Sequence, residues 1–312
     1  MTELHTKYRP KTFDELIGHD AVAAAVQKAL DKGTARSFLF TGEPGLGKTT
    51  FARVIADHLG LDPTSDSSNY IEYDGATNTG VDDMRAILDK TRLLPLSGKR
   101  TRVIVIDEAH MLSKQAWNSA LKVVEEPPPD VYWVFCTSEL RRVPASIRSR
   151  CQEFILSELS DDDIAEIVCQ VIDDEQMTVK SEVTELVIQH AEGRPRKALV
   201  ALGQVEGLNF EDARRVLSGT TEEGHAEVID LCRRLAKGSD YPALAKTVLK
   251  LQGEVTADAV RAQVLAYFTK AAGGQKWRQA AAILTAFGTP YPQGIGNQLW
   301  PVLVSLAELF EE

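Results

Sequence analysis

The residues best suited to chemistry lie in one short stretch, Gly42-Glu-Pro-Gly45-Leu-Gly47-Lys48-Thr49-Thr50, which fits the pattern GxxxxGK[ST]. Glycines such as Gly45 and Gly47 let backbone N–H groups close around phosphate oxygens, and the Lys48 ammonium can reach the β- and γ-phosphates. The Thr49 hydroxyl can bind Mg²⁺, and from Thr50 onward the sequence predicts a helix whose positive end points at the anion. The stretch therefore predicts a binding loop for a nucleoside triphosphate.

A second candidate group ends an apolar run, Val103-Ile-Val-Ile-Asp107-Glu108-Ala-His110. Ligands bind at the carboxyl ends of strands in open α/β sheets, so Asp107 would meet the Mg²⁺ below the phosphates. Glu108 is then placed to orient or deprotonate the attacking water. A strand followed by an acidic turn without function is the alternative. We expect His110 to be structural rather than catalytic.

Five short apolar segments are predicted to form the strands that position these groups. Helical patterns separate the segments, and short, almost continuously apolar strands of this kind favour a parallel sheet covered on both faces. The expected strands are residues 37–41, 70–73, 102–106, 131–136 and 153–155.

The rest of the chain is predicted to be helical. Strand signals stop near Leu159, and Ser160-Asp-Asp-Asp163 is typical of a capped helix start. Helical patterns run to about Leu217, and glycines in 219–224 interrupt the chain before further amphipathic helices. We expect three domains: an α/β domain (1–157), a small helical domain (158–218) and a helical C-terminal domain (219–312).

Composition narrows the class of protein. The 312 residues are 44% hydrophobic and 26% charged, as in an ordinary globular protein. There is no run of about 18 apolar residues and no signal peptide, so an intracellular protein is expected. The four cysteines form no CxxC pair, which indicates neither a zinc site nor a disulfide framework. The net charge of −10 arises mainly in the second half, so a local basic face remains possible in the first.

Several blocks of the sequence resemble the ATPase subunits of sliding-clamp loaders, both the bacterial gamma/tau type and the small subunits of replication factor C. The resemblance covers roughly residues 4–205, and the triplet Ser149-Arg150-Cys151 is its most specific part. The other blocks are the stretch Lys7-Tyr8-Arg9-Pro10 to Ile17-Gly18, the glycine-rich loop, Asp107-Glu108-Ala-His-Met-Leu-Ser113, and Asn118 to Pro128.

That resemblance implies an α/β P-loop module of the AAA+ kind, with a parallel five-stranded sheet, a helical lid and an all-α collar. In such modules ATP lies between neighbouring subunits. Arg150 is then the candidate arginine finger, offered in trans to the γ-phosphate bound by the adjacent subunit, where an always-charged planar donor stabilises the transition state. The alternative is a surface arginine in a basic run.

The resemblance also implies further contacts with ATP. Arg196, within Gly193-Arg-Pro-Arg196, matches the second sensor on the lid, although a helix-start arginine paired with a neighbour is the alternative. Thr137 or Ser138, at the end of a strand, matches the first sensor, and the two are not separated. The stretch lining the adenine pocket corresponds to Tyr8, Arg9, Pro10 and Ile17, for which ordinary packing is a compatible interpretation.

Contacts with DNA and with the clamp are less specific in the sequence. Helix starts near Arg85 and Lys114 could face the backbone of primer–template DNA, with little base readout, although either residue could simply be solvated. The apolar stretch Leu93-Leu94-Pro95-Leu96 could dock on the clamp or belong to the core. Where the gamma/tau type carries a cysteine-rich zinc module, this chain has only residues 60–69, so no zinc is implied.

The sequence therefore predicts an ATP- and Mg²⁺-dependent subunit of a clamp loader, within a five-subunit ring, in the cytoplasm or wherever the replisome lies. Its expected partners are the sliding clamp, primer–template DNA and other loader subunits, with no membrane. A helicase with the same Asp-Glu-Ala-His tetrad would need a second nucleotide-fold domain, and only helices follow residue 158. Another AAA+ motor or remodeller, and a non-hydrolysing scaffold subunit of a loader, remain as alternatives.

Overall fold

The computed structural model describes residues 3–77, 79–92, 100–218, 222–252, 255–271, 277–289, 291 and 298–310. The chain divides into two compact units, Met1–Glu206 and Gly207–Glu312. The boundary expected between residues 157 and 158 lies inside the first unit, and the division into three domains stays a prediction. The apolar stretch from Leu93 to Leu96 lies outside the described residues.

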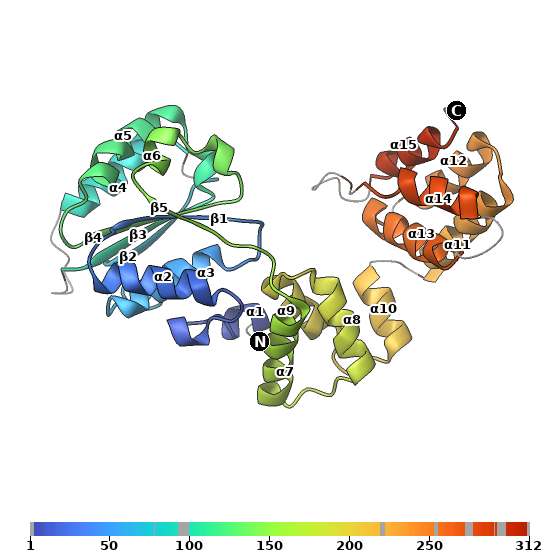
Figure 1. Ribbon diagram of the computed structural model, residues 1–312, viewed down its shortest axis with the longest axis horizontal. Coiled ribbons are helices and arrows are strands. Elements are labelled where there is room, and N and C mark those ends of the chain that lie inside the picture. The colour runs from blue at the N-terminus through green and yellow to red at the C-terminus, as the bar shows by residue number, and fades with distance from the viewer. Residues whose placement is uncertain are drawn as a thin grey trace. The chain divides into compact units, whose positions relative to one another are not determined.

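The first unit is built on a parallel five-stranded sheet in the order β2-β3-β4-β1-β5 (Figure 1). Each strand coincides with a predicted apolar segment to within one residue at either end. The sheet predicted from the sequence is therefore confirmed. Its strands are β1 (Ser37–Thr41), β2 (Tyr70–Asp74), β3 (Arg102–Asp107), β4 (Val131–Thr137) and β5 (Gln152–Ile155).

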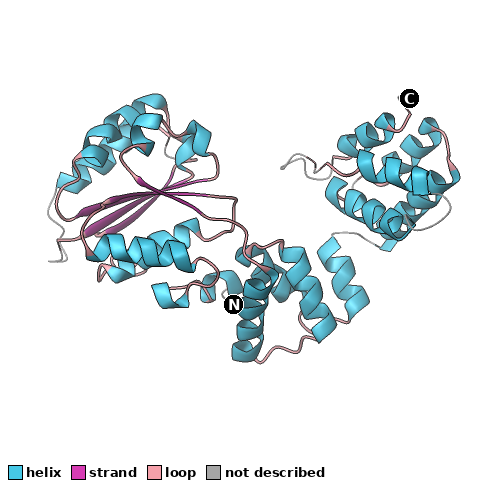
Figure 2. Ribbon diagram, in the orientation of Figure 1, coloured by secondary structure: helices cyan, strands magenta, loops and turns pink. Residues whose placement is uncertain are grey.

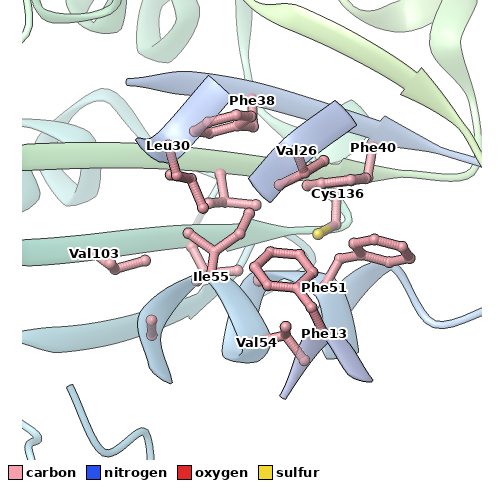
Figure 3. Packing of buried hydrophobic residues seen from close by; sticks show 14 of the residues in the cluster. Phe13, Val26, Leu30, Phe38, Phe40, Phe51, Val54, Ile55, Val103 and Cys136 are labelled. Carbon is pink, nitrogen blue, oxygen red and sulfur yellow. The ribbon is translucent and has the colours of Figure 1, made fainter. Parts of the chain in front are cut away.

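Side chains alternate between the two faces of this sheet, and each face has its own apolar core. Phe38 and Phe40 of β1 pack with Phe51 and Ile55 of a helix on one face, where the rings of Phe40 and Phe51 are stacked 5.1 Å apart (Figure 3). Leu39 points to the opposite face. Burial on both faces explains why the strands are apolar at nearly every position.

Helices cover both faces of the sheet (Figure 1). The core that contains Phe38 includes residues of α2 (Asp20–Asp31) and α3 (Lys48–His58). The core that contains Leu39 includes residues of α4 (Val81–Arg92), α5 (Lys114–Glu125) and α6 (Ala145–Arg148). Three short 3₁₀ segments, η1 (Phe13–Glu15), η2 (Ala109–Met111) and η3 (Leu140–Arg142), lie in the connections.

A group of helices follows the sheet in the first unit. It consists of α7 (Asp161–Glu175), α8 (Ser181–Ala191) and α9 (Pro195–Val205), and the N-terminal α1 (Leu4–Lys7) packs on α9. The Ser160 hydroxyl accepts a hydrogen bond from the N–H of Asp163, whose carboxylate accepts one from the N–H of Ser160. This capping box confirms the predicted helix start.

The second unit is helical in its described residues (Figure 2). It contains α10 (Phe210–Ser218), α11 (Glu222–Lys237), α12 (Tyr241–Lys250), α13 (Ala257–Ala271), α14 (Trp277–Ala286) and α15 (Trp300–Glu308). Residues of α11 to α15 share one apolar core, in which Leu231, Val264 and Phe287 are fully buried. No helix in the described ranges is both long enough and apolar enough to cross a membrane.

Candidate nucleotide-binding site

The glycine-rich loop leaves the carboxyl end of β1 and leads directly into α3. Gly45 and Gly47 have φ angles of 88° and 98°, in the left-handed region that favours glycine. At Gly42 a Cβ atom would lie 2.4 Å from the carbonyl oxygen of Leu156. The loop can adopt this conformation only because these positions lack side chains.

Lys48 lies beneath the loop with 6% of its surface exposed. Its ammonium Nζ donates hydrogen bonds to the carbonyl oxygens of Gly42, at 2.7 Å, and Glu43, at 2.9 Å. Burial lowers the pKa of Lys48, and the nearby carboxylates of Asp107 and Glu108 oppose that shift. The loop thus carries a desolvated cation whose present partners are neutral carbonyl groups.

Thr49 and Asp107 meet although 58 residues separate them, because β3 and the loop end at the same edge of the sheet. The Thr49 hydroxyl donates to Asp107 Oδ2 at 3.1 Å. A hydroxyl beside a carboxylate is a pair of hard oxygen donors of the type that Mg²⁺ prefers. The residues present therefore fit a magnesium site, as the sequence predicts.

Glu108 follows Asp107 with φ 44° and ψ 43°, a left-handed conformation uncommon for a residue with a side chain. Its N–H donates to Asp107 Oδ1 at 2.9 Å. Its carboxylate Oε2 lies 3.3 Å from Nδ1 of His110. Gly75 packs so closely beneath this turn that a Cβ there would lie 2.7 Å from the Glu108 carbonyl oxygen.

The two first-sensor candidates lie in different environments at the end of β4. Thr137 is 0% exposed, and its Oγ1 accepts a hydrogen bond from the N–H of Glu139 at 3.0 Å and lies 3.1 Å from His110 Nδ1. Ser138 is half-buried. Solvent, and hence a phosphate oxygen, has access to Ser138 but not to the Thr137 hydroxyl.

Arg196 lies at the start of α9, beside the glycine-rich loop. A Cβ built on Gly45 would lie 3.5 Å from the Cβ of Arg196 and 3.9 Å from that of Arg194. The structure thus brings Arg196 to the loop, as expected for a second sensor. Pro195 at the first helical position fixes the direction in which α9 starts.

Arg194 was not selected from the sequence, yet it also contacts the loop. Its guanidinium lies 3.8 Å from the carboxylate of Glu43, within the loop, and 3.5 Å from that of Glu158. The only signal for it in the sequence was its place two residues before Arg196. Both arginines bring positive charge to the region where phosphates would bind.

The N-terminal stretch contributes another cation. Burial lowers the pKa of Arg9, and the positive charge of Arg53 lowers it further while Glu72 opposes the shift. Arg196 also contributes a smaller lowering, so these arginines lie near one another. Arg53 is held by an ion pair of 2.9 Å with Glu72.

The other residues expected to line the adenine pocket are Tyr8, Pro10 and Ile17. Desolvation and a hydrogen bond with Glu175 of α7 raise the pKa of Tyr8 to about 12, so its hydroxyl faces α7. Pro10 and Ile17 are half-buried, as either packing or an adenine pocket would require. Thr50, in the first turn of α3, is also half-buried.

His19 was another residue that the sequence analysis did not select. It is 9% exposed, makes a hydrogen bond with the backbone of Leu46 in the glycine-rich loop, and its ring lies 6.0 Å from that of Phe51. Burial lowers the pKa of His19. Its distance of 27 residues from Leu46 left no local pattern from which to predict the contact.

Arg150 lies at the opposite edge of the sheet from all these groups. It precedes β5, whose first residue, Gln152, pairs with Phe38 near the amino end of β1. Its guanidinium donates to the carbonyl oxygen of Ser146 at 2.8 Å and pairs with Glu125 at 3.1 Å. It lines a polar cavity of about 390 Å³ together with Arg36 and Glu125.

Arg85 and Lys114 lie on α4 and α5, which pack against each other. The N–H of Ser113, just before α5, donates to the carbonyl oxygen of Thr79, just before α4, at 3.1 Å. The two helix starts are therefore neighbours. Lys114 is exposed, and Arg85 pairs with Asp82 at 3.2 Å on the surface.

Comparisons with known proteins show similarity to subunits of DNA polymerase III. The model of a family described as DNA polymerase III, delta subunit, matches residues 65–160. The chain is 34% identical over 220 residues to DNA polymerase III subunit gamma of Buchnera aphidicola, covering 65% of this chain and 59% of that protein. It is 32% identical over 242 residues to DNA polymerase III subunit tau of Bacillus subtilis, covering 70% of this chain and 43% of that protein.

Among solved structures, the chain is similar to the RuvB Holliday junction branch migration motor of Thermotoga maritima. The TM-score is 0.57 with 23% sequence identity, over 82% of this chain and 85% of that one. At that identity the likeness concerns the fold alone, and it agrees with the predicted parallel five-stranded sheet followed by helical domains. The gamma and tau relatives confirm the resemblance to clamp-loader ATPase subunits. The chain spans about half the length of these curated relatives.

Proposed function

We propose that this chain is an ATPase subunit of a sliding-clamp loader. ATP binding opens the clamp, and hydrolysis, triggered by primer–template DNA, releases the clamp closed on the DNA. The observation that carries the proposal is the division of catalytic groups between the two edges of one sheet. The phosphate-binding groups lie where the carboxyl ends of the strands meet, which we call the carboxyl edge. Arg150 of the Ser-Arg-Cys triplet lies where the amino ends meet, which we call the amino edge.

ATP is held by the glycine-rich loop and by the cations around it. Lys48 exchanges its hydrogen bonds to the Gly42 and Glu43 carbonyl groups for bonds to phosphate oxygens, which are stronger because both partners are charged. Thr49 and Asp107 would hold Mg²⁺, which neutralises phosphate charge when bound. Arg9, Arg194 and Arg196 supply further positive charge, with Tyr8, Pro10 and Ile17 on the adenine side.

Glu108 orients the attacking water and accepts its proton. The role is supported by its position directly after Asp107, at the carboxyl end of β3 and on the same side of the sheet as the glycine-rich loop. Ser138 acts as the first sensor, because its hydroxyl lies where solvent reaches, whereas the hydroxyl of Thr137 is buried against Glu139 and His110. Thr137 then supports the site from behind.

Arg150 completes the site of a neighbouring subunit. It lies beside the amino end of β1, and the loop begins at the carboxyl end. A strand of this length spans about 16 Å at about 3.3 Å per residue, which exceeds the reach of an arginine side chain. Arg150 therefore serves a γ-phosphate bound by another chain, and ATP hydrolysis depends on assembly with other loader subunits, in a ring of five.

DNA is contacted through its backbone rather than its bases. The neighbouring starts of α4 and α5 direct positive helix ends toward one region, where Lys114 and Arg85 add positive charge. This contact implies binding that weakens with salt and depends little on sequence. The work of such a loader takes place where DNA is replicated, in the cytoplasm of a bacterial cell.

The two alternatives are less well supported. A non-hydrolysing scaffold subunit has no need for the assembled set of Lys48, Thr49, Asp107 and Glu108, all of which this chain brings to one edge. A nucleotide-turnover assay on the assembled complex distinguishes a hydrolysing subunit from a non-hydrolysing scaffold. Another AAA+ motor would form a ring of six, so mass measurement of the assembled complex distinguishes it from a loader of five subunits.

The direct test of the proposed chemistry is Glu108→Gln. This change keeps the size of the side chain but removes its basicity, so we expect ATP binding to be unchanged and turnover to fall by about 10²–10⁴-fold, measured with clamp and primer–template DNA present. Glu185→Gln, at an exposed position of α8, is the matched control and should behave as the parent. Hydrolysis by Glu108→Gln at the parent rate would contradict the assignment.

A further inference from the structure

The imidazole of His110 lies between three groups from two different elements. Its Nδ1 atom is 3.1 Å from Thr137 Oγ1 and 3.3 Å from Glu108 Oε2, and its Nε2 atom is 3.6 Å from Glu139 Oε1. The side chain is 9% exposed. A histidine that serves only to fill space does not need a polar partner at each ring nitrogen.

The contact with Glu108 determines where the ring must carry a proton. An ionised carboxylate only accepts hydrogen bonds, so a favourable contact needs the proton on Nδ1. The other neighbour of Nδ1, Thr137 Oγ1, is fixed in place because it accepts the N–H of Glu139 at 3.0 Å. Nδ1–H can therefore form a hydrogen bond with Thr137 Oγ1 and attract the Glu108 carboxylate, whose Oε2 lies 3.3 Å away.

The ring itself is held from behind. Thr137 is fully buried at the end of β4, so its hydroxyl is a rigid support. On the Nε2 side, Glu139 is exposed and pairs at 2.8 Å with Arg142 in η3, so this contact is weaker than the one with Thr137. These contacts hold the imidazole in one orientation relative to β3 and β4.

Glu108, by contrast, is not fixed by its own packing. Its side chain is 36% exposed and follows a backbone in the left-handed region. A long exposed side chain has several rotamers, and only some of them direct a carboxylate to the water that attacks phosphorus.

We propose that His110 is a positioning residue, which holds the Glu108 carboxylate through Nδ1–H and anchors it to the buried hydroxyl of Thr137. This inference rests on the proposed role of Glu108 in hydrolysis and deepens it. It replaces the expectation from the sequence that His110 is merely structural. His110 acts through Glu108, the group that it contacts.

A pair of substitutions separates the two ring nitrogens. In His110→Asn the side-chain amide N–H stands where Nδ1–H stands now, whereas the longer amide of His110→Gln reaches toward the position of Nε2. We expect His110→Asn to keep kcat for ATP within about threefold of the parent. His110→Gln and His110→Leu should lower kcat by about 10–100-fold, because Glu108 loses its orientation, while KM stays within about twofold.

Steady-state hydrolysis by the assembled complex over a range of ATP concentrations, with clamp and primer–template DNA present, measures kcat and KM, with thermal unfolding and ATP binding measured alongside. His58→Gln is the matched control, since His58 pairs with Asp31 on the surface of α3 and should not affect kcat. Equal rates for His110→Gln, His110→Leu and the parent would overturn the proposal. The proposal would also be overturned if kcat fell equally in His110→Asn and His110→Gln, and if each fall in kcat matched the loss of thermal stability of that variant.

A second variant keeps the test valid if changes at His110 disturb folding. Thr137→Val keeps the shape of the side chain but removes the anchor of Nδ1, so kcat should fall with KM preserved, and Thr137→Ser should restore it. An unchanged kcat in Thr137→Val would contradict the anchoring. The unsubstituted protein tests the proposed function separately. If it neither binds nor hydrolyses ATP in the assembled complex, the proposed function is wrong, whatever the role of His110.

Discussion

The two ends of strand β1 differ in what they can do. At its carboxyl end, Lys48 is desolvated, Thr49 meets Asp107, and glycines leave room for phosphate. At its amino end, Arg150 lies in a polar cavity and pairs with Glu125. In the proposed function, the first end binds the phosphates of one ATP, and the second offers a cation to the ATP of a neighbouring subunit.

This difference shows how assembly can control chemistry without a moving lid. In the proposed assembly, neither edge has to change its fold, because Arg150 of another subunit completes the site. The ion pair between Arg150 and Glu125, 34% and 55% exposed, is of the kind that contributes at most about 1 kcal/mol. Arg150 can therefore exchange Glu125 for a phosphate at low cost.

The largest effect that tests this comparison is expected from Arg150→Ala. In the assembled complex turnover should fall by about 10³-fold or more, since arginine fingers contribute at this level, while ATP binding stays as in the parent. Stability should change by about 1 kcal/mol, because an exposed ion pair with Glu125 and an exposed hydrogen bond to the Ser146 carbonyl oxygen are lost. Steady-state hydrolysis and equilibrium ATP binding measure the two quantities.

Arg148→Ala is the matched control. Arg148 lies two residues away and forms a similar surface pair, at 3.2 Å, with Glu153. If both variants lose the same modest amount of turnover, the amino edge has no specific catalytic role and the comparison fails.

A smaller effect, on stability, distinguishes the glycines of the two edges. At Gly42 an added Cβ would meet the Leu156 carbonyl oxygen at 2.4 Å, so Gly42→Ala should lower the free energy of unfolding by about 2–4 kcal/mol and weaken ATP binding. At Gly33, which lines the cavity beside Arg150, no atom lies within 4 Å of the added Cβ. Gly33→Ala should therefore cost only about 1 kcal/mol, for its left-handed backbone.

Urea unfolding of both variants measures this difference. Equal costs would show that the close packing of the loop against Leu156 is not what requires a glycine at residue 42.

The smallest expected effect is on the pH dependence of stability, through His19 beside the glycine-rich loop. Burial lowers the pKa of His19, so the folded chain keeps this ring neutral at pH values where the unfolded chain already binds a proton. Stability is then fully present above about pH 6.5 and falls as the pH drops through 6.5 toward the lowered value. Thermal unfolding at about pH 7.5 and 5.5 should show a smaller loss in His19→Gln than in the parent.

His58→Gln is the control for this prediction, because His58 lies on the surface and pairs with Asp31. If His19→Gln loses as much stability on acidification as the parent, the buried neutral ring beside Leu46 does not contribute to the pH dependence.

The sheet could be predicted almost completely from the sequence. The strands β1, β3 and β4 are buried on both faces and are short apolar runs with turn residues at their ends, and the outer strands β2 and β5 are less buried but also short, so the sequence pattern located all five. The glycine-rich loop and Asp107 were equally predictable, because the loop has a fixed pattern and the carboxylates end an apolar strand. For these features, the spacing of residues along the sequence is enough to predict the structure.

The supporting contacts could not be predicted in the same way. His19 reaches Leu46, and His110 reaches Thr137 and Glu139, across 27 to 29 residues that leave no periodic signal. Whether Thr137 or Ser138 is the first sensor depends on which side chain is buried. The sequence does not show this for two adjacent residues at the end of a strand. Such details follow only from tertiary packing, which for His110 is the packing of β3 beside β4.

The central proposal is that the two edges of one sheet serve two different ATP molecules, and co-assembly of two inactive variants tests it most directly. Lys48→Ala removes the phosphate-binding cation at one edge, and Arg150→Ala removes the finger at the other. Each variant alone should hydrolyse ATP poorly in the assembled complex, and their mixture should regain turnover, because a Lys48→Ala subunit still offers Arg150 to the intact loop of its neighbour. A mixture no more active than the average of its two components would contradict the proposal.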